Sequence, residues 1–229
     1  MNELVLLKLG GSLITDKTRP YTPRRDKLAE LAAQIASVRA GGSGMRLVRG
    51  RGSGAFGHTA AKEYGTRDGV RKAEDWKGVA EVHFQAAQLN QFVMEALHRV
   101  GISALSFPPS GTVIASDGKV SIWDTTPIRM ALANGILPVV YGDVVFDEVR
   151  GGTILSTEDL FQHLARQLTP ERILLAGLEA GVWADFPARK RLLSGINPQS
   201  YEELKASVGA SHGADVTGGM ESKVGQMLA

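Results

Sequence analysis

The sequence predicts a doubly wound α/β fold, in which a mostly parallel sheet has helices on both faces. Two observations predict it: short apolar runs of strand length recur along the chain, and amphipathic segments of helical length lie between them. A third observation is that 43% of the 229 residues are hydrophobic, which suffices for a full core. We expect a single domain over residues 1–229, with approximate lobes at 1–150 and 151–229.

Five apolar runs are expected to form the parallel strands. They are Leu4 to Leu9, Met45 to Arg49, Ser103 to Phe107, Ile136 to Tyr141 and Arg172 to Ala176. The dipeptide Asp117-Gly118 separates two further runs, Val113 to Ala115 and Val120 to Ile122, and this pattern is typical of a β-hairpin. A hairpin at this position can form a flap over a substrate.

Helices are predicted between the strands. Thr157 is expected to cap one helix, and Asp124 with the turn from Thr125 to Pro127 is expected to start another rather than to bind a substrate. A long amphipathic helix is expected from Trp76 to Arg99. The apolar faces of the first and last helices comprise Leu28, Leu31, Ala32, Ile35 and Val38, and Leu160, Phe161, Leu164 and Leu168.

Composition excludes several classes of protein. The formal charge of +2 comes from 26 basic and 24 acidic residues, so neither nucleic acid nor an anionic membrane is the expected partner. The chain has no cysteine, which removes disulfides, thiolate ligands and a cysteine nucleophile and fits a reducing compartment. No apolar run has transmembrane length and no signal-peptide pattern is present, so we expect a cytoplasmic protein.

A glycine-rich loop follows the first strand and predicts a phosphate site. Lys8 lies near the end of the strand, Gly10, Gly11 and Ser12 follow it, and Lys17 lies at the far end of the loop. Backbone N–H groups of such small residues can point at an anion, and the lysines can neutralise its charge. Gly-Gly after a strand is also common in turns, so a purely structural turn is the alternative.

The second glycine-rich loop allows two interpretations. Gly52, Gly54 and Gly57 have the G-x-G-x-x-G spacing of the dinucleotide-binding fingerprint, which would indicate a nicotinamide or flavin oxidoreductase. That fingerprint normally follows the first strand of its fold, whereas here another glycine-rich loop precedes it. The second interpretation is a phosphate site at a helix start, to which His58 adds a side-chain donor.

A third glycine cluster lies near the end of the sequence. Thr217, Gly218 and Gly219 precede a helical stretch that contains Lys223. Three such loops indicate two phosphorylated ligands. The P-loop pattern and the protein-kinase signatures are missing, so a kinase would have to be of another design.

Four motifs together resemble those of the amino acid kinase superfamily and, within it, the isopentenyl phosphate kinases. They are KLGGSLITDK at Lys8 to Lys17, GSGAFGH at Gly52 to His58, YGDVVFD at Tyr141 to Asp147 and DVTGGMESK at Asp215 to Lys223. The resemblance covers the chain from Leu4 to Lys223. It implies an αβα sandwich, transfer of phosphate from ATP with Mg²⁺ to isopentenyl phosphate in an alternative mevalonate route, and a homodimer. A fosfomycin-type phosphonate kinase and a non-catalytic nucleotide sensor are the remaining alternatives.

The resemblance also implies roles for individual residues. Lys8, Lys17 and Lys223 would stabilise the transferring phosphoryl group, and either Glu158 or Asp159 would orient the lysines. Nucleotide contacts are implied for Lys8, Gly10, Gly11, Ser12, Gly54, Thr217, Gly218, Gly219 and Lys223. Acceptor contacts are implied for Ser53, Gly54, Ala55, His58, Gly142, Asp143 and Thr157. No residue is expected to ligate a metal directly.

The sequence departs from the family pattern at several positions. Ser156 to Asp159 replaces the common Ser-Gly-Asp-Asp, and Ala176 to Trp183 lacks the usual aspartates of the nucleotide side. Arg51, Ser53 and Ala55 stand where His, Gly and Ser are common. Family members usually continue well beyond the position of Lys223, so the sequence either is truncated or lacks part of the nucleotide pocket, and in the second case we expect weakened ATP binding or weakened stability.

The apolar pocket expected for an isoprenoid chain cannot be assigned from the sequence. Trp76, Val79, Val82 and Phe84 cannot all face one way on a helix, and an ordinary core stripe is the alternative. By resemblance His83 borders this pocket. The other three histidines have no metal-ligand spacing, and surface or packing roles are expected for His98, His163 and His212.

Overall fold

The computed structural model describes residues 3–41, 45–186, 188–204 and 219–228. The chain divides into two compact units, residues 1–176 and 177–229. The division follows Ala176, whereas the sequence pattern predicts a boundary near residue 150. Each unit is described by itself below.

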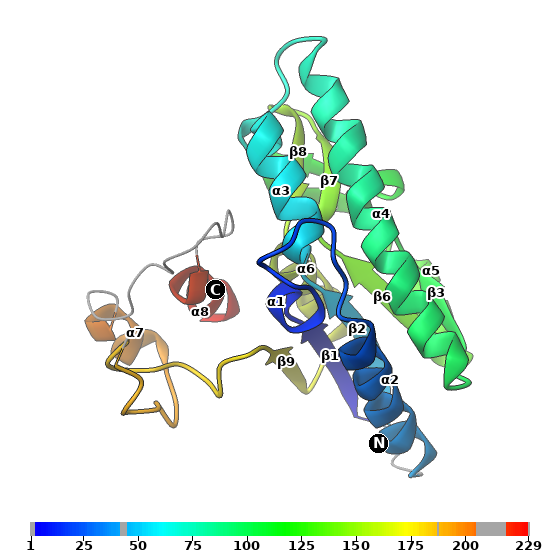
Figure 1. Cartoon of the computed structure of the whole chain (residues 1–229), viewed down its shortest axis with the longest axis vertical. Coiled ribbons are helices and arrows are strands. Elements are labelled where there is room, and N and C mark those ends of the chain that lie inside the picture. Colours follow the sequence, from blue (N-terminus) through cyan, green and yellow to red (C-terminus); the bar gives the residue numbers. More distant parts are fainter. Residues whose placement is uncertain (1–2, 42–44, 187, 205–218, 229) are drawn as a thin grey trace. The chain divides into compact units, whose positions relative to one another are not determined.

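The first unit is built on a parallel sheet of five strands (Figure 1). The strand order is β3 (Ala104–Ser106), β6 (Leu137–Tyr141), β2 (Arg46–Arg51), β1 (Leu4–Leu9) and β9 (Arg172–Ala176), and all neighbours are parallel. These strands are the five apolar runs of the sequence, so the parallel-sheet prediction is confirmed.

Helices cover both faces of this sheet. Successive residues of a strand point to opposite faces, and in β1 Val5 and Leu9 pack with α2 (Arg25–Ala40), α3 (Gly54–Tyr64) and α4 (Asp75–Arg99). Leu4 and Leu6 face the other way, in a second core with α5 (Thr126–Ala133) and α6 (Thr157–Leu168). The doubly wound arrangement that the sequence predicts is therefore present.

A second, four-stranded sheet contains the predicted hairpin. Its order is β5 (Lys119–Trp123), β4 (Val113–Ser116), β7 (Asp143–Asp147) and β8 (Gly151–Leu155). Asp117 and Gly118 have φ of 48° and 77°, as a two-residue hairpin turn with positive φ requires. Because β4 also pairs in parallel with β7, the hairpin is the edge of a sheet. The strands β7 and β8 are not predicted from the sequence, which identifies 141–147 only as a motif.

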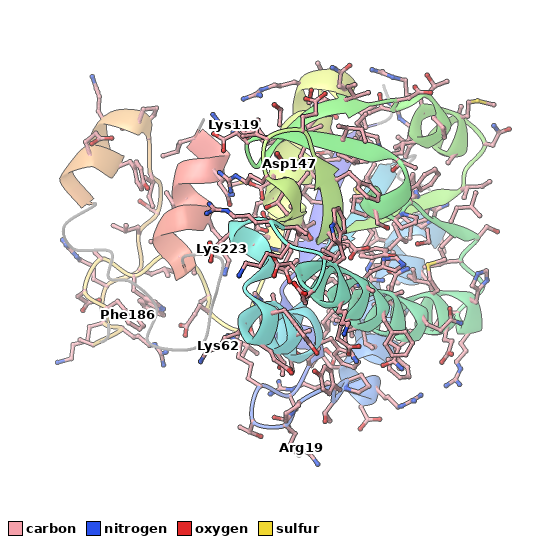
Figure 2. The ribbon with its side chains drawn as sticks, turned by 90° about the horizontal axis from the view of Figure 1, so that it is seen from above. Arg19, Lys62, Lys119, Asp147, Phe186 and Lys223 are labelled. Atoms are coloured by element: carbon pink, nitrogen blue, oxygen red, sulfur yellow. The ribbon has the colours of Figure 1, made fainter. Side chains whose placement is uncertain are left out.

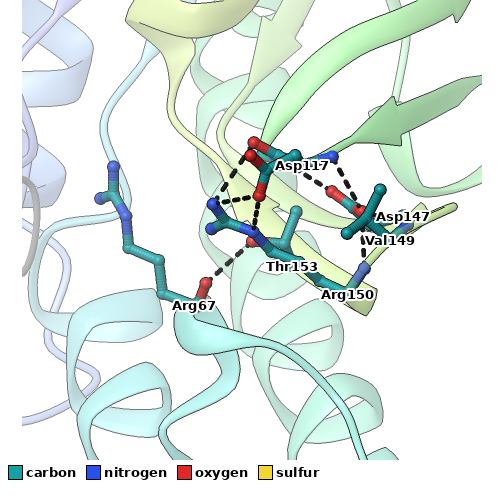
Figure 3. Close-up of polar contacts among 7 residues, drawn as sticks. Arg67, Asp117, Asp147, Val149, Arg150 and Thr153 are labelled. Carbon is teal, nitrogen blue, oxygen red and sulfur yellow. Dashed lines mark hydrogen bonds and ion pairs between the residues drawn. The ribbon is translucent and has the colours of Figure 1, made fainter.

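Asp147 joins the turns of the two hairpins (Figure 3). Its carboxylate accepts four backbone N–H groups at 2.7 to 3.1 Å, from Asp117, Gly118, Val149 and Arg150. Burial alone would raise the pKa of this carboxyl, but the four donors outweigh burial and hold the pKa below its usual value. Figure 2 shows Asp147 at the same end of this sheet as Lys119, the first residue of β5.

The second unit contains α7 (Pro198–Leu204) and α8 (Gly219–Leu228). A side chain on Gly225 of α8 would lie 2.7 Å from the hydroxyl of Tyr201, so the absence of one lets α7 and α8 approach closely. Glu179 accepts a hydrogen bond from the Trp183 indole at 2.8 Å and pairs with Arg189 at 2.8 Å. Among the described residues of both units, no helix combines the length and the apolar character needed to cross a membrane.

Candidate active site

Three neighbouring strands of the parallel sheet end at one level, and a glycine follows each of them. The pairing register places Leu9 beside Arg51 and Arg51 beside Tyr141, and the next residues are Gly10, Gly52 and Gly142. The carboxyl edge of a parallel sheet is where ligands bind in open α/β folds. The first two glycine loops of the sequence and the start of β7 therefore share one edge.

The first two glycine loops pack backbone against backbone. A Cβ on Gly11 would lie 2.3 Å from the nitrogen of Gly54, and a Cβ on Gly52 would lie 2.7 Å from the nitrogen of Gly11. Gly54 has a φ of +53°, and a Cβ there would lie 2.3 Å from Thr15 Oγ1. These positions exclude side chains because the loops touch, whatever ligand the loops bind.

The packed loops present several amides without an acceptor. Among the described residues, the N–H groups of Gly11, Ser12, Ser53 and Gly54 donate to no other group, because they begin the helices α1 (Gly11–Ile14) and α3. The N–H of Ala55 differs, since it donates to Thr15 Oγ1 at 3.0 Å. Such helix starts favour negative charge, so the loops form a site suited to an anion.

Lys8 lies near this edge and forms an ion pair with Glu158 of α6. Both groups are buried, with 8% of Lys8 and 2% of Glu158 exposed. Asp159 has a different role, because its carboxylate accepts from the amide and the hydroxyl of Ser156, each at 2.7 Å, and Ser156 Oγ accepts from the Asp159 amide at 3.1 Å. Of the two candidate carboxylates, Glu158 faces Lys8 and Asp159 forms the capping box of α6 with Ser156.

The predicted cap at Thr157 is wrong by one residue, since Ser156 is the N-cap of α6. The Thr157 hydroxyl instead donates to the carbonyl of Arg51 at 2.5 Å and accepts from the amide of Gly142 at 3.0 Å. A Cβ on Gly50 would lie 2.5 Å from Thr157 Cγ2, so α6 approaches β2 closely here. Thr157 therefore fixes the ends of β2 and β6 relative to each other, and its hydroxyl already has both partners.

Asp143 is a buried carboxyl that hydrogen-bonds to the partly exposed His83. Its side chain is 0% exposed and its Oδ2 lies 2.9 Å from Nδ1 of His83, whose side chain is 45% exposed. Burial raises the pKa of Asp143, and the bond to His83 offsets part of that rise. The same bond raises the pKa of His83 against a smaller opposing effect of burial. The sequence predicts neither this pair nor the burial of Asp143.

Two arginines of β2 are buried on the face that α4 covers. Arg51 donates to the carbonyl of Ala86 in α4, and its guanidinium lies 4.3 Å from the centre of the Tyr141 ring. Burial lowers the pKa of Arg51 to about 10, and burial together with the charge of Arg51 lowers that of Arg49 to about 9. The sequence shows Arg51 only as a departure from the family pattern, and the structure makes it a buried charge directly before the second loop.

The remaining predicted residues have varied positions. Lys17 is exposed in the loop after α1, where hydrogen bonds from Thr18 and Arg19 lower the pKa of the neighbouring Asp16 to about 2. His58 lies on α3 and is partly buried. Gly219 and Lys223 lie on α8 of the second unit, and Thr217 and Gly218 lie outside the described residues. In the described ranges, no group of three or more His, Cys, Asp or Glu side chains is arranged to hold a metal ion.

Residues 3–229 match the Amino acid kinase family. The chain belongs to this family of phosphotransferases. A structure titled as an aspartate kinase from Synechocystis, 13% identical, has the same fold, with a TM-score of 0.65 over 88% of this chain and 33% of that one.

Within the family, the chain groups with the isopentenyl phosphate kinases. It is 36% identical to the one from Methanothermobacter thermautotrophicus over 98% of its own length and 86% of that protein. It is 34% identical to the one from Haloferax volcanii over 99% of its own length and 88% of that protein. The predicted fold class and family are confirmed.

Solved structures agree with this grouping. X-ray structures of isopentenyl phosphate kinase align with a TM-score of 0.76 and 35% identity, over 84% of this chain and 82% of that one. The T. acidophilum isopentenyl phosphate kinase product complex aligns with a TM-score of 0.74 and 27% identity, over 89% of this chain and 84% of that one. These relatives favour a kinase over the oxidoreductase that the spacing of Gly52, Gly54 and Gly57 left open.

Proposed function

We propose that this chain transfers a phosphoryl group from ATP to isopentenyl phosphate, giving isopentenyl diphosphate and ADP in an alternative mevalonate route to isoprenoids. Relatives named for this activity, at up to 36% identity over almost the whole chain, support the proposal. The structural observation that carries it is the pair of interlocked glycine loops, whose free amides share a sheet edge with the buried Lys8–Glu158 pair.

The proposed chemistry depends on charge neutralisation rather than on a strong general base. The attacking oxygen of a phosphate monoester is already anionic, so the main obstacle is repulsion between two polyanions that must be aligned. Amides at helix starts and a lysine side chain offset that repulsion. In this proposal Lys8 stabilises the transferring group, and Glu158 is a positioning residue that holds Lys8 at the sheet edge.

The acceptor phosphate is assigned to the amides of Ser53 and Gly54 and to His58. The amides of Ala55 and Gly142 already donate to Thr15 and Thr157, so they position the loops rather than contact the acceptor. Gly10, Gly11 and Ser12 are assigned to the nucleotide together with Lys17, Gly219 and Lys223, as the family resemblance implies. Mg²⁺ is expected to arrive with ATP, held mainly by phosphates and water. A homodimer and a cytoplasmic location complete the proposal, from the resemblance and from the composition respectively.

The direct test is a substrate panel with ATP and Mg²⁺, containing isopentenyl phosphate, dimethylallyl phosphate, fosfomycin and carbamate. We expect isopentenyl phosphate to have the highest kcat/KM, and Lys8→Ala or His58→Ala to lower it by on the order of 100- to 1,000-fold. Lys62→Ala is the matched control, because Lys62 is an exposed residue on the same helix as His58 (Figure 2). Preference for fosfomycin, or nucleotide binding without turnover of any acceptor, would refute the assignment.

A further inference from the structure

We propose that His83 is a further acceptor-binding residue, whose imidazolium contacts the acceptor phosphate while the buried Asp143 positions it. This inference rests on the proposed function, since it names a second histidine of the same acceptor site. It depends on three observations: the geometry of the pair, its place in the fold, and the buried charges around it.

The geometry is that of a histidine fixed by a carboxylate at one nitrogen and available at the other. Asp143 Oδ2 holds Nδ1 of His83 at 2.9 Å, and the Asp143 side chain is fully buried. Within the described residues, Nε2 of His83 has no hydrogen-bond partner, and 45% of the side chain is exposed. A carboxylate at Nδ1 fixes the orientation of the ring and favours its protonated form, in which Nε2 is a charged donor.

The place of the pair is the acceptor side of the first unit. Ala60 and Ala61 of α3, Val82 of α4 and Val144 of β7 form one small apolar cluster. His58 comes two residues before Ala60, His83 directly follows Val82, and Asp143 directly precedes Val144. The elements α3, α4 and β7 therefore pack together beside the pair, α3 also carries His58, and Asp143 follows Gly142 at the edge where the glycine loops lie.

The buried charges around the pair favour an ionised Asp143. Arg51 of β2 attracts the Asp143 carboxylate. Tyr141 of β6 adds no negative charge, because burial and Asp143 raise the pKa of its phenol and keep it protonated. The charge of Arg51 also lowers the pKa of Arg49 in the same strand. Burial still outweighs these charges and leaves the pKa of Asp143 raised, while the bond to Asp143 raises the pKa of His83, so that more of the imidazole is cationic at neutral pH.

The competing role is that of a tertiary contact that only holds α4 against β7. Kinetics separate the two roles, because an acceptor contact changes KM and its pH dependence whereas a tertiary contact changes stability. Between pH 7 and 9 the acceptor phosphate is already doubly ionised, since its second pKa is about 6. Over this range a rise in KM reports the loss of a protein cation rather than a change in the acceptor.

The test compares His83→Gln with the wild type and with His98→Gln, an exposed histidine in the last turn of the same helix. We expect His83→Gln to raise the KM for isopentenyl phosphate about tenfold at pH 7 with little change in kcat, as for a lost charge-assisted hydrogen bond. The wild-type KM should rise toward pH 9 and that of His83→Gln should not, while His98→Gln follows the wild type. An unchanged KM, or a raised KM that keeps the wild-type pH dependence, overturns the inference.

A second measurement needs no turnover. NMR titration of the His83 ring, with and without inorganic phosphate, should show a higher pKa with phosphate, and in Asp143→Asn the pKa without phosphate should be lower than in the wild type. A His83 pKa that does not respond to phosphate contradicts the inference. Failure of the wild type to phosphorylate isopentenyl phosphate refutes only the proposed function, and this titration then still decides the role of His83.

Discussion

Glu158 and Asp159 are adjacent carboxylates with different roles, so a pair of isosteric substitutions tests the site directly. Glu158→Gln removes the carboxylate that forms the ion pair with the buried Lys8, and Asp159→Asn weakens the capping box of α6. Breaking a buried ion pair from one side costs about 3–5 kcal/mol, and we expect about 3 because 10% of the Lys8 side chain is exposed. Each kcal/mol lowers the melting temperature of a protein of this size by about 2–4 °C, which gives a decrease of about 6–12 °C.

The activity of the two variants should differ even more. Without Glu158 the ammonium of Lys8 is no longer held at the sheet edge, and we expect kcat to decrease on the order of 100-fold. Loss of a cap costs about 1 kcal/mol, so Asp159→Asn should melt about 2–4 °C lower with kcat almost unchanged. Thermal unfolding and steady-state kinetics on the same preparations measure both effects. A decrease in kcat for Asp159→Asn equal to that for Glu158→Gln would show that this division of roles is mistaken.

Two further predictions concern the framework of the site. Asp147→Asn places an amide donor where a carboxylate oxygen accepts a backbone N–H, and it should destabilise the protein by about 2–3 kcal/mol, against about 1 or less for the matched Asp117→Asn, whose side chain is 72% exposed. Because the folded-state pKa of Asp147 is lowered, its contribution to stability is present above the unfolded pKa of about 4 and is lost as the pH falls through the folded-state pKa. Urea unfolding of both variants at pH 7 and pH 3 measures this effect. Equal losses of stability in the two variants at pH 7 would contradict it. Gly54→Ala should cost about 4 kcal/mol, because strain at a φ of +53° adds to a Cβ that lies 2.3 Å from Thr15 Oγ1. Gly65→Ala, at a φ of +62° with open space around it, should cost about 1 kcal/mol, so similar unfolding curves for the two alanine variants would exclude the packing explanation.

Local patterns in the sequence are sufficient to predict the parallel sheet. The strands Leu4–Leu9 and Arg172–Ala176 are almost continuous apolar runs, and their bounds in the structure are those predicted, although Arg172–Ala176 is a partly exposed edge strand. The strands β7 and β8 are harder to predict, because Asp147 and two glycines interrupt their apolar pattern. These strands are stabilised by the hydrogen bonds of Asp147 to two turns, one of which includes Asp117, 30 positions away in sequence. Hydrophobic periodicity cannot predict a bond between residues so far apart.

Residue types and spacing predict the ligand class of the site but not its internal contacts. The glycine loops and Lys8 are evident from the sequence, since glycine-rich turns after strands are typical of phosphate sites. Which of Glu158 and Asp159 pairs with Lys8 depends on the direction in which each carboxylate points at the start of α6. The S-x-x-D pattern from Ser156 to Asp159 could have indicated the capping box. The His83–Asp143 pair joins residues 60 positions apart, so only the packing of α4 on β7 reveals it.

The interlocked glycine loops also have a mechanical consequence. Where Gly11, Gly52 and Gly54 touch, no side chain lies between the two backbones, so no rotamer change can absorb a displacement of either loop. The two loops therefore behave as one rigid body, and a shift imposed on one is passed directly to the other. Residues 10–12 and 52–54, although about 40 positions apart in sequence, are therefore expected to move together.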